Sequence, residues 1–448
     1  MNCESKHDAD TMKKHHDLTL KTGPAVMFDM QEILDPETLD TQLIRDDIIE
    51  SQARPDKEVR RIELEFTSQN WHGFVWKHYA QVFVPPNYAG ESKIGIIGQK
   101  WQDFKEDSDR SIIPETGKKT IAEYAEGTAL DLDLPIMIFA VPGEDINGMF
   151  ESDLTGWAYQ QMLATGDYTW FSYYPIAKSY LRAITLMGEL LDLNNGRAVL
   201  LGCSKRGMGI AIAAGVDPKR VSGIMTTCYH GGNNLYMAAL KFAQFGPDVG
   251  GPSEDRIGPA YIPAPDLLRS LNNPIGLTAL GLYDPYIWRD QIKSSYFVVL
   301  GTNDEFFGIG SPNEMMTSFK GDKAFLAIDN ITHTWVSDKH LAAWRMWLSY
   351  NFRQHTIPEI KVNTDKTNQT FSIRAEVKSD YQLKGVKLYY AVNDSSDWRF
   401  ATWFSKPMEL KNGNFISSLD LKDAHSLGYY VEVEDSKDGL VSSLIEFV

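Results

Sequence analysis

Cysteine is scarce in this sequence, which holds only Cys3, Cys203 and Cys228 among its 448 residues. Three cysteines cannot build a disulfide framework, although two of them are enough for one disulfide. The sequence has no CxxC pair and no Cys/His spacing typical of structural zinc. We therefore expect no metal site, and nothing in the sequence calls for an organic cofactor.

Long apolar runs are also missing. No window approaches the roughly 18 apolar residues of a membrane span, and Met1–Asp17 lacks the apolar stretch of a signal peptide. Clusters of basic residues are absent too, and 44 Lys and Arg against 60 Asp and Glu give a formal net charge of −16. Nucleic acid and anionic membranes are therefore not expected as partners, whereas a small-molecule or peptide substrate is.

The remaining composition is that of a large folded protein, with 43% hydrophobic and 23% charged residues. The length predicts two or three domains. The first segment, 1–55, is polar and shows no strong alternation, so we interpret it as an N-terminal extension. A main domain is expected over 56–356 and a smaller one over 357–448.

The main domain contains short apolar strands separated by segments of helical periodicity. This pattern predicts a doubly wound α/β sheet that is mostly parallel and covered on both faces. The expected strands are Ile94–Ile97, Ile136–Val141, Ala198–Leu201, Val221–Met225, Tyr296–Leu300 and Ala324–Ile328.

The C-terminal domain contains only short alternating segments separated by Asp, Asn, Gly and Ser turns. This pattern predicts a small β-sandwich of immunoglobulin-like size. Such a module is a candidate arm for a protein or glycan partner.

The most informative stretch is VLLGCSKRGMGIAI, Val199–Ile212, where an apolar strand runs into a turn and then a helix from about Gly207. A phosphate-binding loop would need lysine and a hydroxyl where Met208 and Gly209 stand, so that reading is disfavoured. A nucleophile on a tight strand-to-helix turn fits better, with Ser204 at the turn.

Two neighbours of Ser204 bear on this interpretation. Cys203 precedes the turn position and is expected to point into the core, which leaves Ser204 as the nucleophile. Gly202 allows a tight turn, but Arg206 stands where a GxSxG motif has its second glycine. We expect the Arg206 side chain to be buried in a polar contact that braces the turn.

A reactive serine needs a base and a group that orients the base. Asp304 follows the strand Tyr296–Leu300, and His333 follows the next strand. The order Ser, Asp, His at successive strand ends predicts a catalytic triad at the carboxyl edge of the sheet. Glu305 is the alternative partner for the histidine, but Asp304 comes first after the strand and is preferred.

Four further residues are assigned to binding. The backbone N–H of Lys205 is expected to stabilise an oxyanion, and Gln99 is the candidate for a second donor. His230 and Asn234 lie in the Cys228–Asn234 segment and are expected to line the substrate pocket.

The chain resembles the PhoPQ-activated pathogenicity-related proteins, which have an α/β-hydrolase fold. The blocks that carry the resemblance are Ser68–Trp71, Trp76–His78, Thr165–Trp170, Tyr174–Lys178, Gly202–Gly207, Asp284–Asp290, Asp304–Phe307 and the His333 loop. The resemblance implies that Ser204, Asp304 and His333 are the triad positions. It also implies that the protein is exported and is periplasmic, secreted or lipid-anchored. Separately, the Cys203–Ser204 pair is similar to the turn of glucuronoyl esterases.

These observations predict a serine hydrolase that cleaves an ester or amide bond through an acyl-enzyme. The segment between Thr227 and Ile292 is long enough to form a cap over the site. Three alternatives stay open: a carbohydrate esterase of the glucuronoyl type, a peptidase that holds the substrate amine with Glu144 and Asp145, and a catalytically weak binding or signalling protein of this fold.

Overall fold

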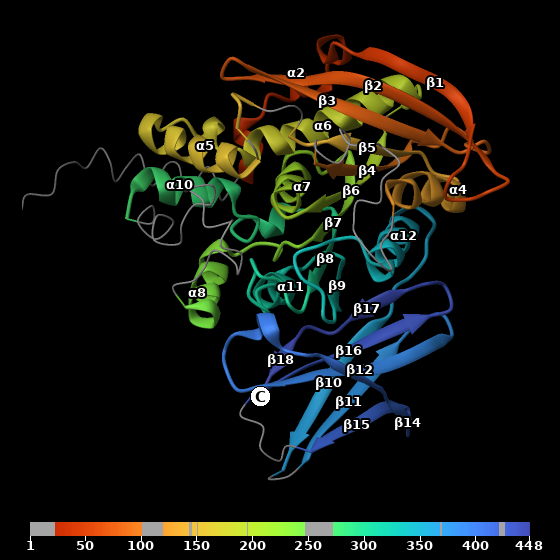
Figure 1. Ribbon diagram of the computed structural model, residues 1–448, viewed down its shortest axis with the longest axis vertical. Helices are drawn as coiled ribbons and strands as arrows, with labels where there is room; N and C mark the ends of the chain where they lie inside the picture. The colour runs from red at the N-terminus through yellow and green to blue at the C-terminus, as the bar shows by residue number, and fades with distance from the viewer. Residues whose placement is uncertain are drawn as a thin grey trace, which may run out of the picture.

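The computed structural model describes residues 23–448 except for 101–119, 143–145, 150, 195, 247–271, 368–369 and 421–425. Within these limits the chain forms one nine-stranded sheet and two smaller antiparallel sheets (Figure 1). The predicted doubly wound α/β-hydrolase sheet followed by a C-terminal β-sandwich is confirmed.

The large sheet has the strand order β1-β2-β3-β5-β4-β6-β7-β8-β9. Its antiparallel part runs from β1 to the pairing of β3 with β5, and the pairs from β5 to β9 are all parallel. The strands are β1 (Gln42–Glu50), β2 (Glu58–Trp71), β3 (Phe74–Val84), β4 (Lys93–Gln99), β5 (Ile136–Ala140), β6 (Arg197–Cys203), β7 (Val221–Thr227), β8 (Ser295–Gly301) and β9 (Lys323–Ile328). The parallel arrangement brings the carboxyl ends of β6, β7, β8 and β9 to one edge.

One prediction needs correction at the N-terminus. Residues 42–50 were assigned to an extension without regular structure, but they form β1, which pairs with β2 along its length. The sequence pattern did not predict this strand because its side chains are exposed or half-buried throughout. No buried apolar face therefore alternates with a polar one. The segment before it is anchored by the buried Arg182, whose guanidinium donates to the backbone oxygens of Glu32, Ile33 and Asp35.

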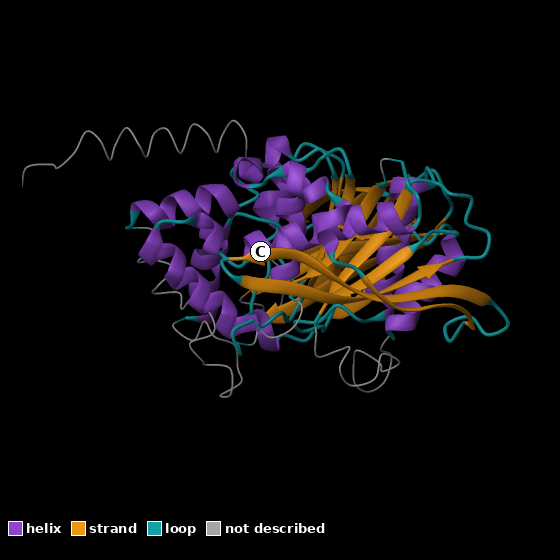
Figure 2. Ribbon diagram, turned by 90° about the horizontal axis from the view of Figure 1, so that it is seen from above, coloured by secondary structure: helices purple, strands orange, loops and turns teal. Residues whose placement is uncertain are grey.

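Both faces of the sheet are covered by helices, which Figure 2 shows on the two sides of the strands. Strand β6 shows why: Ala198 and Leu200 belong to one hydrophobic core, and Val199 and Leu201 belong to the other. The first core is closed by α6 (Tyr173–Leu190) and α7 (Lys205–Val216), and the second by η3 (Glu123–Gly127), α4 (Thr128–Leu132) and α12 (Asp338–Phe352).

The remaining helical segments are short or lie at the rim of the sheet. They are η1 (Gly23–Met27), α2 (Met30–Leu34), η2 (Pro36–Leu39), α5 (Glu151–Thr165), η4 (Tyr168–Trp170), α8 (Asn234–Phe245), α10 (Pro274–Tyr283), η6 (Arg289–Gln291), α11 (Asn313–Ser318) and η7 (Trp398–Phe400). In the described part of the chain, no helix is both long enough and apolar enough to cross a membrane.

The C-terminal module packs two antiparallel sheets around their own core, which includes Phe371, Ile373, Leu388 and Val431. One sheet has the order β10-β11-β15-β14, and the other has β13-β12-β16-β17 with β18 on β16. The strands are β10 (Glu359–Lys366), β11 (Thr370–Lys378), β12 (Leu383–Asn393), β13 (Phe404–Pro407), β14 (Glu409–Lys411), β15 (Asn414–Asp420), β16 (Ser426–Asp435), β17 (Leu440–Ser442) and β18 (Glu446–Phe447). The module lies next to the β9 side of the large sheet (Figure 1).

Two asparagines join the sandwich to the loops at the carboxyl edge of the large sheet. Nδ2 of Asn303 donates to the backbone oxygens of Arg399 at 3.0 Å and Ala401 at 2.7 Å. Asn330 and the backbone of Trp403 exchange two hydrogen bonds, each 2.9 Å long. The sandwich is therefore fixed to the two loops that follow β8 and β9.

This junction predicts the effect of Asn303→Ala. The substitution leaves two largely buried backbone oxygens without their donor, so we expect a loss of about 1–3 kcal/mol in the free energy of unfolding. Urea unfolding followed by tryptophan fluorescence measures it. The matched control is Asn363→Ala on β10, where the side chain is exposed. Equal unfolding free energies for the two variants would contradict a structural role for the junction.

Candidate active site

Ser204 occupies the turn between β6 and α7. Its backbone has φ 57° and ψ −120°, a conformation that L-residues rarely adopt and that costs of order 1–3 kcal/mol. The backbone N–H of Ser204 donates to Thr227 O at 2.8 Å, which ties the turn to the end of the neighbouring strand β7. The strain is thus supported by the sheet itself, as in a nucleophile turn.

The turn can close because two glycines meet across it. A Cβ atom on Gly202 would lie 2.5 Å from the backbone oxygen of Arg206, and one on Gly207 would lie 2.8 Å from Cβ of Tyr229. The second small residue therefore stands at 207, one position later than the GxSxG motif places it. Helix α7 begins at Lys205, two residues earlier than expected.

Arg206 is buried, with 4% of its surface exposed. Its positive charge lies close to Tyr180, where it opposes the burial that raises the pKa of the phenol, and close to Cys203, where it helps to lower the pKa of the thiol. Tyr180 in turn donates its hydroxyl to Leu201 O at 2.9 Å, within β6. Arg206 is therefore buried beside the turn among polar groups that contact β6.

Asp304 and His333 are in direct contact. Nδ1 of His333 lies 2.8 Å from Oδ2 of Asp304, whose side chain is fully buried. Oδ1 of Asp304 accepts from the backbone N–H groups of Phe306 at 2.8 Å and Phe307 at 2.9 Å. Three donors thus surround the carboxylate, and the imidazole keeps Nε2 for another partner.

Glu305, the alternative partner for the histidine, has a different role. Its Oε2 accepts from the backbone N–H of His333 at 2.8 Å and so holds the loop rather than the ring. Burial acts to lower the pKa of His333, but the charge and hydrogen bond of Asp304 outweigh it, so this pKa lies above its ordinary value.

The three predicted catalytic residues lie at one edge of the sheet. Ser204 is bonded to Thr227, and the next residue, Cys228, places its sulfur within 4.8 Å of the nearest ligand atoms of Asp304 and His333. The charge of His333 also acts on the thiol of Cys203, the residue before the serine. The turn that carries Ser204 therefore lies beside the Asp304–His333 pair.

The two cysteines at this edge are engaged with each other and with the core. The neighbouring thiol of Cys228 lowers the pKa of Cys203 to about 7 against the opposing effect of its burial. Burial raises the pKa of Cys228, and its sulfur lies 2.7 Å from Thr334 O. Cys203 also packs against the core that includes Leu201, as expected for a side chain turned away from the turn position.

Cys228, Asp304 and His333 are also a group of described residues whose ligand atoms could surround a metal ion. However, these atoms already take part in hydrogen bonds within the protein. The thiol of Cys228 donates to Thr334, and both oxygens of Asp304 accept hydrogen bonds. The chemistry of this set fits a hydrogen-bonded acid–base pair better than a ligand set.

The expected oxyanion donors lie near the turn. Lys205 is the first residue of α7, where a helix leaves its N–H groups without intrahelical partners. Gln99 ends β4, and its backbone oxygen accepts from Val141 N–H at 2.7 Å. Nε2 of Gln99 is a buried donor that has no hydrogen-bond partner among the residues that the structure describes.

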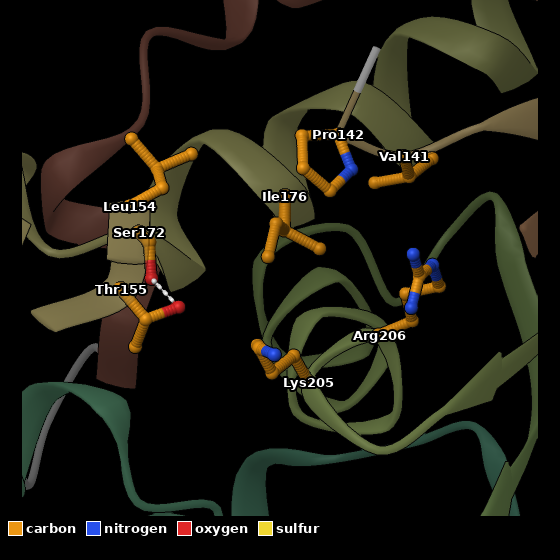
Figure 3. A pocket seen from close by; sticks show the side chains of 8 residues that line it. All are labelled: Val141, Pro142, Leu154, Thr155, Ser172, Ile176, Lys205 and Arg206. Atoms are coloured by element: carbon orange, nitrogen blue, oxygen red, sulfur yellow. Dashed lines mark hydrogen bonds between the residues drawn. The ribbon is translucent and has the colours of Figure 1, made fainter. Parts of the chain in front are cut away.

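A small cavity opens beside the turn (Figure 3). Its volume of about 10 Å³ has room for about one water molecule. Lys205 and Arg206 lie on one side of it, and the hydroxyls of Thr155 and Ser172, 3.4 Å apart, lie on the other. The rest of the lining is apolar and includes Ile176.

The two predicted pocket residues differ in their surroundings. His230 is buried with 1% exposure and packs on Phe307 with ring centroids 5.2 Å apart, close to His333. Asn234 begins α8, and its backbone N–H donates to Asp284 at 2.7 Å, so it anchors the helix. Glu144 and Asp145, proposed above as a pair for a substrate amine, lie outside the described residues, as does Cys3.

Lys241 is a residue that the sequence analysis missed. It lies on α8, in the segment expected to form the cap, with Nζ 6.0 Å from the ring centroid of Phe306. Its charge interacts with Asp304 and His230. A single lysine on a helix has no spacing that distinguishes it from a surface lysine, so no sequence signal could have found it.

Comparisons with known proteins bear on the family and the fold. The model of the family described as PhoPQ-activated pathogenicity-related protein matches residues 47–399. Autocrine proliferation repressor protein A of Dictyostelium discoideum is 24% identical over 265 residues, which cover 56% of this chain and 50% of that protein. The matched part therefore spans about half the length of that relative.

Among solved structures, two esterases resemble the chain. The acetyl xylan esterase of Paenibacillus sp. R4 has a TM-score of 0.47 and 12% identity, with 79% of this chain and 96% of that chain covered. The glucuronoyl esterase of Solibacter usitatus has a TM-score of 0.45 and 10% identity, with 76% of this chain and 92% of that chain covered.

The close approach at the turn predicts the effect of Gly202→Ala. The added methyl group would meet the backbone of Arg206 at 2.5 Å, where nothing flexible can move away, so we expect destabilisation of about 1–3 kcal/mol or more. Chemical unfolding measures the change. The matched control is Gly385→Ala on β12, where a Cβ meets open space. Equal stability of the two variants would show that the turn tolerates a side chain at 202.

Proposed function

We propose that this chain, which belongs to the PhoPQ-activated pathogenicity-related protein family, is a serine hydrolase that cleaves ester or amide bonds. Ser204 is assigned as the nucleophile, His333 as the base and Asp304 as the group that orients the base. The observation that carries the proposal is the combination of a strained serine at a strand-to-helix turn with a buried Asp–His pair at the same sheet edge.

The proposed mechanism follows from the hydrogen bond that already holds one nitrogen of the His333 ring. Because Nδ1 of His333 is held by Asp304, the free Nε2 would accept the proton of Ser204 while Oγ attacks the substrate carbonyl carbon. The Lys205 N–H at the start of α7 would stabilise the oxyanion. The imidazolium then returns the proton to the leaving alcohol or amine, which leaves an acyl-enzyme. Water, activated by the same imidazole, hydrolyses the acyl-enzyme and frees Ser204.

A second candidate function comes from the name of one relative, autocrine proliferation repressor protein A. By analogy, the chain would be a regulatory protein of the same fold, and the sandwich would be its binding arm. The two candidates differ in one measurable property, which is the reactivity of Ser204. A carbohydrate esterase and a peptidase are finer versions of the first candidate, and a panel of sugar esters, simple esters and peptide amides separates them.

Labelling with a fluorophosphonate probe tests the enzyme proposal. We expect Oγ of Ser204 to displace fluoride from the probe, because the turn, the base and the helix N-terminus together activate the hydroxyl. Mass spectrometry of the labelled protein identifies the modified residue. Ser204→Ala should lose the label, whereas Ser405→Ala, at an exposed position of β13, should keep it. A folded wild-type protein that stays unlabelled would favour the regulatory candidate.

The pH dependence of kcat/KM tests the assignment of the base. Activity requires neutral His333, so kcat/KM should rise with pH through the His333 pKa, which lies above its ordinary value of 6.5. Asp304→Asn removes the negative charge that raises the pKa of His333, whereas burial still lowers this pKa. The acidic limb of the kcat/KM profile should therefore move to lower pH. The rate should also fall by about 10⁴-fold. The exposed Asp365→Asn is the matched control, and an acidic limb that does not move in Asp304→Asn would refute the pairing.

A further inference from the structure

A lysine beside the Asp304–His333 pair is held without a counterion. Lys241 projects from α8 over the ring of Phe306, which itself packs on His333 with centroids 4.6 Å apart. Nζ of Lys241 makes no hydrogen bond or ion pair with any residue that the structure describes. Burial lowers the pKa of Lys241 to about 8, while the charge of Asp304 acts in the opposite direction.

Asp304, the carboxylate whose charge acts favourably on Lys241, cannot serve as its partner. Asp304 already accepts hydrogen bonds from Phe306, Phe307 and His333. The other charged neighbour is Arg399 of the sandwich, which repels the ammonium and has its own ion pair with Asp397 at 2.6 Å. Lys241 is half-buried, and an added anion would stabilise an ammonium that lacks a counterion among the described residues.

His230 supplies a second unsatisfied group at the same place. Its ring is buried with 1% exposure, and neither Nδ1 nor Nε2 has a hydrogen-bond partner in the described part of the chain. Burial and, to a smaller extent, the nearby charge of Lys241 lower the pKa of His230 to about 3. The imidazole is thus neutral at neutral pH and keeps one N–H donor available.

Both groups lie next to the catalytic base. The ring of Phe307 contacts His230 at 5.2 Å and His333 at 5.8 Å between centroids. Nζ of Lys241, on α8, lies over the ring of the neighbouring Phe306. The buried His230 and the half-buried Lys241, which have no acceptors among the described residues, therefore both lie within one side chain of the Asp304–His333 pair.

We propose that Lys241 and His230 form a carboxylate-binding subsite, so that the substrates of this hydrolase carry a carboxylate close to the bond that is cleaved. The inference rests on the proposed function and specifies its substrate class. The ammonium binds one carboxylate oxygen through a charge-assisted hydrogen bond, and the imidazole N–H donates to the other. A neutral substrate would leave the buried His230 donor and the half-buried Lys241 ammonium unpaired, so the site discriminates against it.

Matched esters test the subsite. The probes are 4-nitrophenyl acetate, which is neutral, and 4-nitrophenyl hemisuccinate, whose acyl group carries a carboxylate. The measured quantity is the ratio of kcat/KM for the hemisuccinate to kcat/KM for the acetate. Lys241→Met keeps the length of the side chain but removes the charge, so we expect this ratio to fall by about 10- to 100-fold. Lys241→Arg should restore a large part of it, and an unchanged ratio in Lys241→Met would overturn the subsite.

A matched control and a binding measurement complete the test. Lys320→Met removes a lysine whose side chain is 85% exposed and should leave the ratio unchanged, which separates a local effect from the loss of one positive charge. Succinate binding to Ser204→Ala, followed by calorimetry, does not depend on turnover. Binding that is lost in the Ser204→Ala, Lys241→Met double variant supports the subsite even if wild type hydrolyses neither ester, in which case only the proposed function fails. Absence of succinate binding to Ser204→Ala together with hydrolysis of the acetate alone would overturn the subsite and keep the hydrolase.

Discussion

The buried carboxylate of Asp304 is the constraint on which the architecture of the site depends. A charge removed from water is costly unless donors surround it, and here they come from two loops: Phe306 and Phe307 from its own loop and His333 from the next. The loops must therefore be fixed relative to each other. Backbone bonds from Thr302 to Ile328 O at 2.9 Å and from Asn303 to Ile331 O at 3.0 Å do this, as an extension of the pairing between β8 and β9.

The same constraint explains why the β-sandwich is fixed to the carboxyl edge of the large sheet. Asn303 and Asn330 flank the two loops and bind the backbone of the sandwich, so that each loop is held from the sheet side and from the sandwich side. The hydrophobic cores follow the same plan, because Tyr430 and Trp403 of the sandwich pack with the core beneath α6 and α7. The sandwich is thus a structural part of the site support, whatever else it binds.

The parts of the site that could be predicted from sequence are those attached to strand ends. Parallel strands bring their carboxyl ends to one edge, so the order of Ser204, Asp304 and His333 after three apolar runs was enough to expect them together. Arg206 was predicted to be buried and is buried. It stands where the GxSxG motif has its second glycine, and the glycine that lets the turn close is Gly207. Strand β1 was missed because neither of its faces is buried, and Lys241 because its role comes from tertiary contacts on a helix without a distinctive pattern.

This division between predictable and unpredictable residues has a physical origin. The strained turn at Ser204 and the Asp304–His333 pair are built from the regular sheet, whose geometry dictates where the chain turns. The two groups proposed to bind a substrate come instead from α8 and the segment before it, where Lys241 and His230 stay unsatisfied within the described chain. A satisfied buried polar group stabilises the fold, whereas an unsatisfied one costs stability and is compensated only when a ligand binds. In the proposed hydrolase, the reacting groups would therefore come from the sheet, and the choice of substrate would come from the groups of α8 and the segment before it that lack partners in the described chain.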